Sequence, residues 1–223
     1  DEGFLLHPDE RGIVFVAQMI HAPESLIEAL SPARSPLNPL RDPDGQPRLY
    51  AYGHLPLYAN ILVAPLARGT GAASDPASAL LRAGRILSAL WDTLTVLIVA
   101  LAARELAGRG AGLLAGVLSA LSVLHIQNAH FATVDAALAF FCTLCMWLLM
   151  RHAKYGHPVS LLLTGATVGF AAGCKATGAL LVLPLLATAG RVPRRVLAGA
   201  LGAAALCFLL TNPYALLDAA VYG

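Results

Sequence analysis

Two adjacent carboxylates, Asp9 and Glu10, follow a proline in the segment HPDE (7–10) near the start of the chain. A carboxylate placed next to a hydroxyl group can act as a general base and accept its proton. An acidic pair is also common in the first turn of a helix, because its oxygens accept hydrogen bonds from backbone N–H groups that have no partner within the helix. The sequence therefore leaves two interpretations of this pair open, a catalytic base and a helix cap.

Three further ionisable residues lie inside or at the ends of apolar stretches: Asp92, Asp135 and Lys175. Ionisable groups in such positions are energetically costly and are candidates for function. Each also has a structural alternative. Asp92 could accept a hydrogen bond between helices, Asp135 could cap a helix, and Lys175 could extend its amino group to the lipid headgroups.

The histidines and cysteines do not form a metal-binding pattern. His125 and His130 are five residues apart, whereas two zinc ligands on one helix face are four apart. His130 is close to Asp135 in the sequence, but this pair alone does not define a site. Cys142 and Cys145 have the spacing of a redox or zinc motif, yet they lie in an apolar run without a second pair. We therefore interpret the cysteines as small buried thiols and predict no metal.

The composition is typical of a membrane protein. Hydrophobic residues make up 57% of the chain and charged residues 13%, and the mean hydropathy is +0.68. A soluble domain has about 25% charged residues. The net charge of +2 is too small to indicate a nucleic-acid partner.

The elements that position the candidate residues are predicted to be membrane helices. Apolar stretches rich in Ala, Gly and Leu fall at about 86–103, 111–126, 134–150, 159–174, 176–190 and 196–211. Small residues allow such helices to pack closely in lipid. We expect an all-α fold, a polytopic transmembrane bundle of about six spanning helices.

The first 84 residues differ from the rest, since they hold most of the prolines and most of the acidic residues. They contain apolar pieces at 13–20, 25–30 and 57–66, each too short to cross a bilayer, which takes about 20 apolar residues. We expect these pieces to form short helices at the membrane interface.

Loop charge predicts the topology. The short loops at 104–110, 151–158 and 191–195 are basic, and basic short loops face the cytoplasm. The chain then divides into an outer first loop (1–84), a helix bundle (85–211) and the start of the next outer loop (212–223). An outer first loop requires a spanning helix before it, so we expect the chain to be a fragment of a longer protein.

Several stretches together resemble a known family. They are HPDE (7–10), YAYGHLPLY (50–58), GRILSALWDTLTV (84–96), SVLHIQNAHFATVDAALAFF (122–141), GFAAGCKATGALLVLPLL (169–186) and NPY (212–214). In order and spacing, over nearly the whole chain, they resemble the GT-C type of membrane glycosyltransferases. The resemblance is closest to the protein O-mannosyltransferase and aminoarabinose-transferase-like group, glycosyltransferase family 39 and its relatives.

The resemblance implies roles for the candidate residues. An acidic residue of the first outer loop serves as the base in this family, and by motif position it is Asp9, with Glu10 beside it. A second acidic position in the next outer loop matches Asp135, with His130 near it. The other candidates are Arg85 and Lys175 for the phosphate of the lipid donor, and Arg11, His54 and Asp92 as weaker matches.

The implied function is transfer of a sugar from a polyprenyl-phosphate donor to an acceptor hydroxyl on the outer face of the membrane. Such a transfer passes through an oxocarbenium-like state, and the departing phosphate gains negative charge. The acceptor is a protein, a lipid or a glycan. No cofactor is predicted, although a divalent metal stays open as an alternative without a ligand set in the sequence. We expect an integral protein of the bacterial plasma membrane with an extracytoplasmic active site.

Two other functions remain alternatives at this stage. A transporter or flippase for a lipid-linked or small polar substrate would use Asp92 and Lys175 to line a pathway, but the sequence shows no clear internal repeat of the kind common in transporters. A membrane scaffold would bind the donor without turnover.

Overall fold

The computed structural model describes residues 7–69 and 75–222 and confirms the all-α prediction. The elements in chain order are α1 (Pro8–Ala17), α2 (Leu26–Leu30), α3 (His54–Gly69), α4 (Pro76–Ala120), α5 (Val123–His130), α6 (Asp135–Tyr155), α7 (Pro158–Cys174), η1 (Ala176–Leu181), α8 (Val182–Leu186), α9 (Arg194–Thr211), α10 (Tyr214–Leu217) and α11 (Ala219–Tyr222). In the described part of the chain, the only β-type pairing is an isolated bridge between Arg41 and Pro47.

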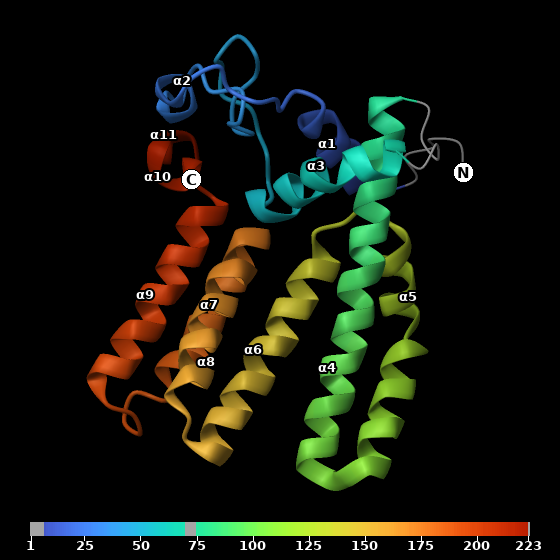
Figure 1. Ribbon diagram of the computed structural model, residues 1–223, viewed down its shortest axis with the longest axis vertical. Helices are drawn as coiled ribbons and strands as arrows, with labels where there is room; N and C mark the ends of the chain where they lie inside the picture. Colours follow the sequence, from blue (N-terminus) through green and yellow to red (C-terminus); the bar gives the residue numbers. More distant parts are fainter. Residues whose placement is uncertain (1–6, 70–74, 223) are drawn as a thin grey trace.

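The long helices α4, α6, α7 and α9 stand side by side and form the body of the molecule (Figure 1). Helix α7 packs against both α6 and α9, and α4 packs against α6. Among the described helices, α4, α6 and α9 are long and apolar enough to cross a membrane, while α7 and the segment Ala176–Leu186 are shorter apolar helices. The bundle thus has the character of a membrane domain.

Helix α4 contains a reversal at Gly108, inside the connection at 104–110 that the sequence predicted between two membrane helices. Gly108 has φ of 88° and ψ of −179°, outside the helical region, and only glycine adopts such a conformation without strain. The chain turns back there, so that Gly112 lies against Ala100 and Arg104 of the same helix. The predicted stretch 111–126 is therefore divided between this return arm and α5.

Small residues bring α7 and α9 close together, as the sequence predicted. A Cβ atom added to Gly165 would lie 1.9 Å from the carbonyl oxygen of Ala200, and one added to Gly169 would lie 2.3 Å from that of Ala204. The two backbones are in direct contact at these positions. This is the packing expected for helices that associate in lipid through glycine and alanine.

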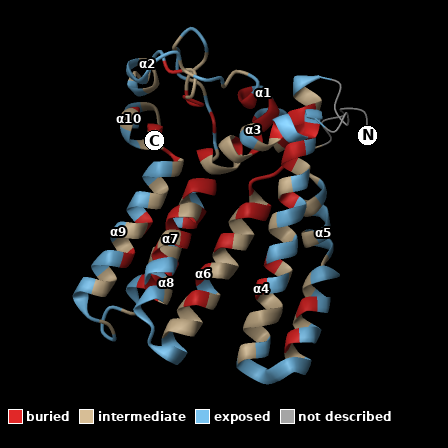
Figure 2. Ribbon diagram, in the orientation of Figure 1, coloured by how far each residue is buried: buried red, intermediate tan, exposed pale blue. Residues whose placement is uncertain are grey.

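The segment 7–69 forms a layer over one end of the bundle (Figure 1). We call this end the loop end. Helices α1, α2 and α3 occur at the three short apolar pieces predicted from the sequence, and α1 and α3 pack against α4. Buried side chains concentrate where α1, α3 and α4 meet (Figure 2). Leu57, Leu80 and Val134 belong to this core.

A polar clamp ties this layer to the segment that follows α9. The guanidinium of Arg41 donates to Asp218 at 2.6 and 2.8 Å, and the Asn38 amide donates to the same carboxylate at 2.9 Å. The hydroxyl of Tyr214 lies 2.5 Å from Ser35 Oγ and donates to the carbonyl of Ala29 at 2.9 Å. The loop layer is therefore fixed at both sides of the bundle, by α4 and by α10.

Candidate active site

Helix α1 begins with a capping box that decides where its two carboxylates lie. His7 is the N-cap and accepts a hydrogen bond from the backbone N–H of Asp9, and Pro8 occupies the first helical position, which has no need of an N–H donor. Glu10 reaches back to the N–H of His7 at 3.3 Å. Adjacent positions on a helix point in different directions, so Asp9 and Glu10 enter different environments.

Glu10 is fully buried and is engaged by several donors. Its carboxylate accepts hydrogen bonds from Arg85 Nε at 2.9 Å, from Arg85 Nη2 at 3.1 Å and from the backbone N–H of Ala132 at 2.8 Å. Burial acts to raise the pKa of Glu10, but the bonds from Arg85, Ala132 and His7 outweigh it and hold the pKa below its ordinary value. A carboxylate in this environment is a weak base.

The Glu10–Arg85 pair connects three elements. Glu10 belongs to α1 and Arg85 to α4, while Ala132 lies in the turn between α5 and α6, just before Asp135. The pair therefore fixes the start of α1, and with it Asp9, relative to the start of α6. Of the two interpretations that the sequence left open, the structure thus supports the helix cap for Glu10, which in addition forms an ion pair with Arg85. It differs from the sequence prediction that Glu10 supports the base and that Arg85 holds the lipid phosphate.

Asp9 has a more accessible environment. Its side chain is 22% exposed, and Oδ1 lies 3.9 Å from His7 Nδ1. The hydroxyl of Tyr52 is close enough to Asp9 for this carboxylate to act on its pKa. Desolvation, the Asp9 carboxylate and the negative charge of Asp135 raise the pKa of Tyr52 to about 12, so the phenol keeps its proton and can serve as a donor near both carboxylates.

Tyr52 is held in place by the neighbouring backbone. The N–H of Gly53 donates to the carbonyl of Cys174 at 2.9 Å, and a Cβ atom at Gly53 would lie only 2.0 Å from the carbonyl oxygen of Gly173. The chain before α3 thus lies directly against the end of α7. Sequence reasoning missed Tyr52, because the pattern YAYG (50–53) indicates an aromatic segment without showing what its hydroxyl groups contact.

Asp135 and Lys175 form an ion pair between the start of α6 and the end of α7. Lys175 Nζ lies 3.0 Å from Asp135 Oδ1, and the two side chains are 36% and 40% exposed. Asp135 is not the N-cap of α6, since Val134 occupies that position without a side-chain cap. The capping alternative was therefore wrong for Asp135. An ion pair this exposed contributes about 0–1 kcal/mol, so a ligand can open it at little cost.

The remaining candidates lie apart from these groups. Asp92 is hydrogen-bonded to His125 between α4 and α5, which matches its structural alternative. His130 is exposed, and its ring bonds the carbonyl of Ile126 at 2.6 Å, on its own helix. Arg11 is exposed on α1. No group of three or more His, Cys, Asp or Glu side chains suited to a metal ion occurs among the residues that the structure describes.

His54 is buried in a cage of tyrosine rings. The ring centroids of Tyr50, Tyr58, Tyr214 and Tyr222 lie 5.7 to 6.4 Å from that of His54, and neither ring nitrogen of His54 has a hydrogen-bond partner. Desolvation lowers the pKa of His54 to about 4, so the ring is neutral near pH 7. A neutral, enclosed imidazole is poorly suited to bind a phosphate.

The structure therefore assembles four of its polar side chains at the loop end of the bundle: Asp9, Tyr52, Asp135 and Lys175. Asp9 and Asp135 both raise the pKa of the Tyr52 phenol, and Asp135 pairs with Lys175. We call this set the acidic cluster. It offers a carboxylate with access to solvent, a phenol donor and a cation, which are the groups needed to deprotonate a hydroxyl and to hold an anion.

Fold and site together define an all-α integral membrane protein whose acidic and cationic groups meet at one end of the helix bundle, under a long loop layer. The family model for dolichyl-phosphate-mannose-protein mannosyltransferase matches residues 78–218, which is more than half of the chain. The chain belongs to this family, a group of GT-C type membrane glycosyltransferases. Comparison with curated proteins and with solved structures gave no match.

The family match confirms the resemblance at this level, while the finer subgroup stays a prediction. The matched segment contains Arg85, Asp135 and Lys175 but begins after Asp9 and Tyr52. The roles of Asp9 and Tyr52 therefore depend on their geometry. Asp92 and Lys175, which a transporter would align along one pathway, belong to two separate pairs.

Proposed function

We propose that the protein transfers a sugar from a polyprenyl-phosphate donor to an acceptor hydroxyl, with Asp9 as the general base. The observation that supports this role is the difference between the two neighbouring carboxylates. Glu10 is buried under Arg85 with its acceptor capacity engaged, while Asp9 is partly exposed within the acidic cluster. Of the two, Asp9 is the one that an acceptor can reach.

In this proposal the other members of the cluster have distinct tasks. Tyr52 donates a hydrogen bond to Asp9 and orients its carboxylate. Lys175 exchanges its weak contact with Asp135 for the phosphate of the donor, whose charge grows as the sugar departs. Asp135 then lies beside the transferred sugar or the acceptor. The Glu10–Arg85 pair positions Asp9 and has no direct part in the chemistry.

The proposed location is the outer face of the bacterial plasma membrane. Its support is the distribution of charge along the bundle. Arg104 lies on α4 one turn before the reversal at Gly108, Arg151 lies in the last turns of α6, and Arg191 lies in the connection before α9, all away from the loop end. Basic short loops remain in the cytoplasm during insertion. The acceptor, whether protein, lipid or glycan, would approach under the loop layer, and the family description suggests mannose as the first sugar to test.

The test uses the full-length protein with polyprenyl-phosphate mannose and compares Asp9→Asn with the control Asp44→Asn, which removes an exposed loop carboxylate. Loss of a general base lowers a rate by about 10²–10⁴-fold. We expect that loss for Asp9→Asn, with unchanged donor binding, and full activity for the control. An Asp9→Asn variant with the activity of the unmodified protein would refute the assignment.

A further inference from the structure

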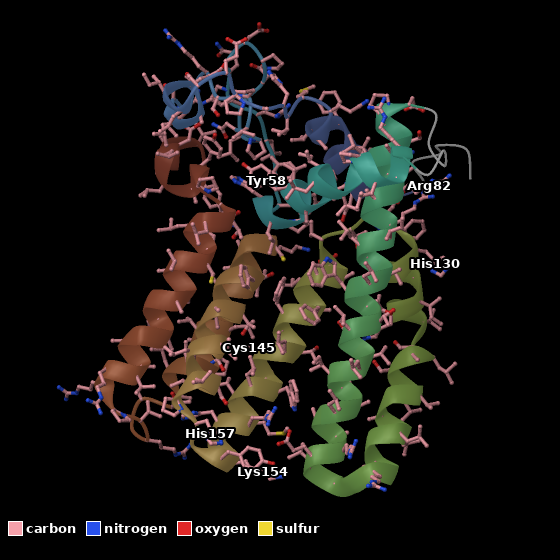
Figure 3. All side chains as sticks on the ribbon, viewed as in Figure 1. Tyr58, Arg82, His130, Cys145, Lys154 and His157 are labelled. Carbon is pink, nitrogen blue, oxygen red and sulfur yellow. The ribbon has the colours of Figure 1, made fainter. Side chains whose placement is uncertain are left out.

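A second polar site lies at the opposite end of the bundle from the acidic cluster. Figure 3 labels Lys154 and His157 at this end, far from Tyr58 and Arg82 at the loop end. There α4 and α6 border a shallow, open surface cavity of about 410 Å³. Its polar lining consists of Arg104, Glu105, Trp147, Arg151, Lys154 and Tyr155. We call it the basic pocket.

The single carboxylate of the basic pocket is engaged by its own neighbours. Glu105 accepts a hydrogen bond from Trp147 Nε1 at 3.0 Å, and Tyr155 lines the pocket beside it. Arg151 Nε lies 3.7 Å from the same carboxylate. These contacts fix the Trp147 side chain at the rim and reduce the ability of Glu105 to repel a second anion.

Three cations, Arg104, Arg151 and Lys154, share the lining of the pocket. The guanidinium of Arg151 lies 5.2 Å from the Trp147 ring centroid and 5.7 Å from that of Tyr155, a cation–π arrangement that limits its rotamers. Lys154 Nζ donates to the backbone carbonyl of Glu105 at 3.0 Å. With Arg104, three cations face one carboxylate, so the lining has an excess of positive charge suited to a phosphate group.

The surroundings indicate that the phosphate is part of a lipid. Leu97 and Leu101 precede Glu105 by two turns and one turn on the same face of α4, and Leu97 is 51% exposed. Further along, the ring of Trp91 on α4 contacts that of Phe140 on α6 in a tilted arrangement, with ring centroids 5.0 Å apart. An apolar track thus leads away from the basic pocket along α4 and α6. The pocket itself contains Trp147 and Tyr155, and these residue types are typical of the headgroup level of a membrane.

We propose that the basic pocket binds the phosphate of an anionic phospholipid headgroup, whose acyl chains lie along the track between α4 and α6. Basic pockets between transmembrane helices recognise anionic headgroups in this way. The site is independent of the proposed sugar transfer. It lies at the other end of the bundle and shares no residue with the acidic cluster.

The experiment measures lipid retention by the full-length protein, using native mass spectrometry in detergent with phosphatidylglycerol or phosphatidylcholine. The test variant is Arg104→Gln with Lys154→Gln, since both side chains are exposed and their loss leaves the core intact. The control is Arg194→Gln with Arg195→Gln, which removes the same charge from the start of α9, outside the pocket.

We expect the unmodified protein and the control to retain phosphatidylglycerol in preference to phosphatidylcholine, and the test variant to lose affinity for phosphatidylglycerol by roughly 30-fold for two charges. Equal retention of the two lipids, or equal losses in test and control variants, would overturn the proposal. Displacement of the lipid by inorganic phosphate alone at low concentration would also overturn it, because the pocket would then recognise a soluble anion. Thermal unfolding of each variant shows whether it is folded.

Discussion

Changes in the Glu10–Arg85 pair test directly whether Glu10 has the structural role that separates it from Asp9, the proposed base. Replacing Arg85 by methionine preserves most of the side-chain volume but leaves the Glu10 carboxylate fully buried, with only the N–H groups of Ala132 and His7 at 2.8 and 3.3 Å. Removing one partner of a buried ion pair destabilises a protein by about 3–5 kcal/mol, because an uncompensated charge remains. We expect a loss of that size for Arg85→Met.

The complementary change is milder. Glu10→Gln removes the charge but retains a carbonyl oxygen for the backbone donors, and Arg85 is 19% exposed and can turn toward water. A cost of about 1–3 kcal/mol follows for the lost charged hydrogen bonds. The double variant Glu10→Gln with Arg85→Met should be more stable than Arg85→Met alone, since it leaves no buried charge. Non-additivity of this kind identifies a direct interaction.

The assay is equilibrium unfolding of the full-length protein and the three variants in detergent, followed at several pH values. Because the folded pKa of Glu10 lies below its ordinary value of 4.5, its contribution is present above that pH and is lost as the pH falls below it. Glu10→Gln should remove this part of the acid sensitivity. If Arg85→Met is as stable as the unmodified protein and loses only affinity for polyprenyl phosphate, then Arg85 serves the donor and our reasoning is refuted.

Two further predictions concern the tyrosine cage and the α7–α9 contact. The pKa of His54 is lowered from 6.5 to about 4, so the free energy of unfolding should fall by about 3 kcal/mol as the pH drops from 6.5 to 4. The variant His54→Phe has no group that titrates there, and its unfolding should lack this decline. An identical pH profile for the variant and the unmodified protein would contradict the burial argument. Gly165→Ala places a Cβ atom 1.9 Å from the carbonyl oxygen of Ala200 and should lower the free energy of unfolding by about 1–3 kcal/mol. The control Gly202→Ala, whose added Cβ atom meets nothing within 4 Å, should have little effect. Equal melting temperatures of the two variants would contradict this prediction and show that α9 can move away.

The helical class and the close packing of the bundle could be predicted from sequence, because they depend on local composition. Apolar stretches indicate membrane helices, and glycines spaced along 165–173 indicate close packing of α7. The sequence predicted a connection at 104–110, but the tightness of the reversal at Gly108 was harder to predict. The segment ELAGRGAG (105–112) indicates a loop of several residues, yet only Gly108 leaves the helical conformation and the turn is unusually short.

The partners of the site residues could not be predicted, since they depend on tertiary contacts. The sequence identified Glu10 and Arg85 separately, but 75 positions separate them, and nothing local indicates that one neutralises the other. Asp135 and Lys175 were also candidates, yet their pairing follows from the side-by-side packing of α6 and α7. Tyr52 lacked any signal, because a tyrosine hydroxyl acquires a role only from the carboxylate beside it.

The first arm of α4 is a continuous helix, and its length sets the distance between the two ends of the molecule. Arg85 and Glu105 both lie before the reversal at Gly108, and at 1.5 Å per residue their separation along the axis is about 30 Å. That length equals the hydrocarbon thickness of a typical bilayer. A thinner membrane is therefore met by tilting of α4, whereas a thicker one is met by local thinning of the bilayer. Such a tilt moves Arg85 and, through the Glu10–Arg85 pair, the first turn of α1. The chain length of the surrounding lipid therefore affects the position of Asp9.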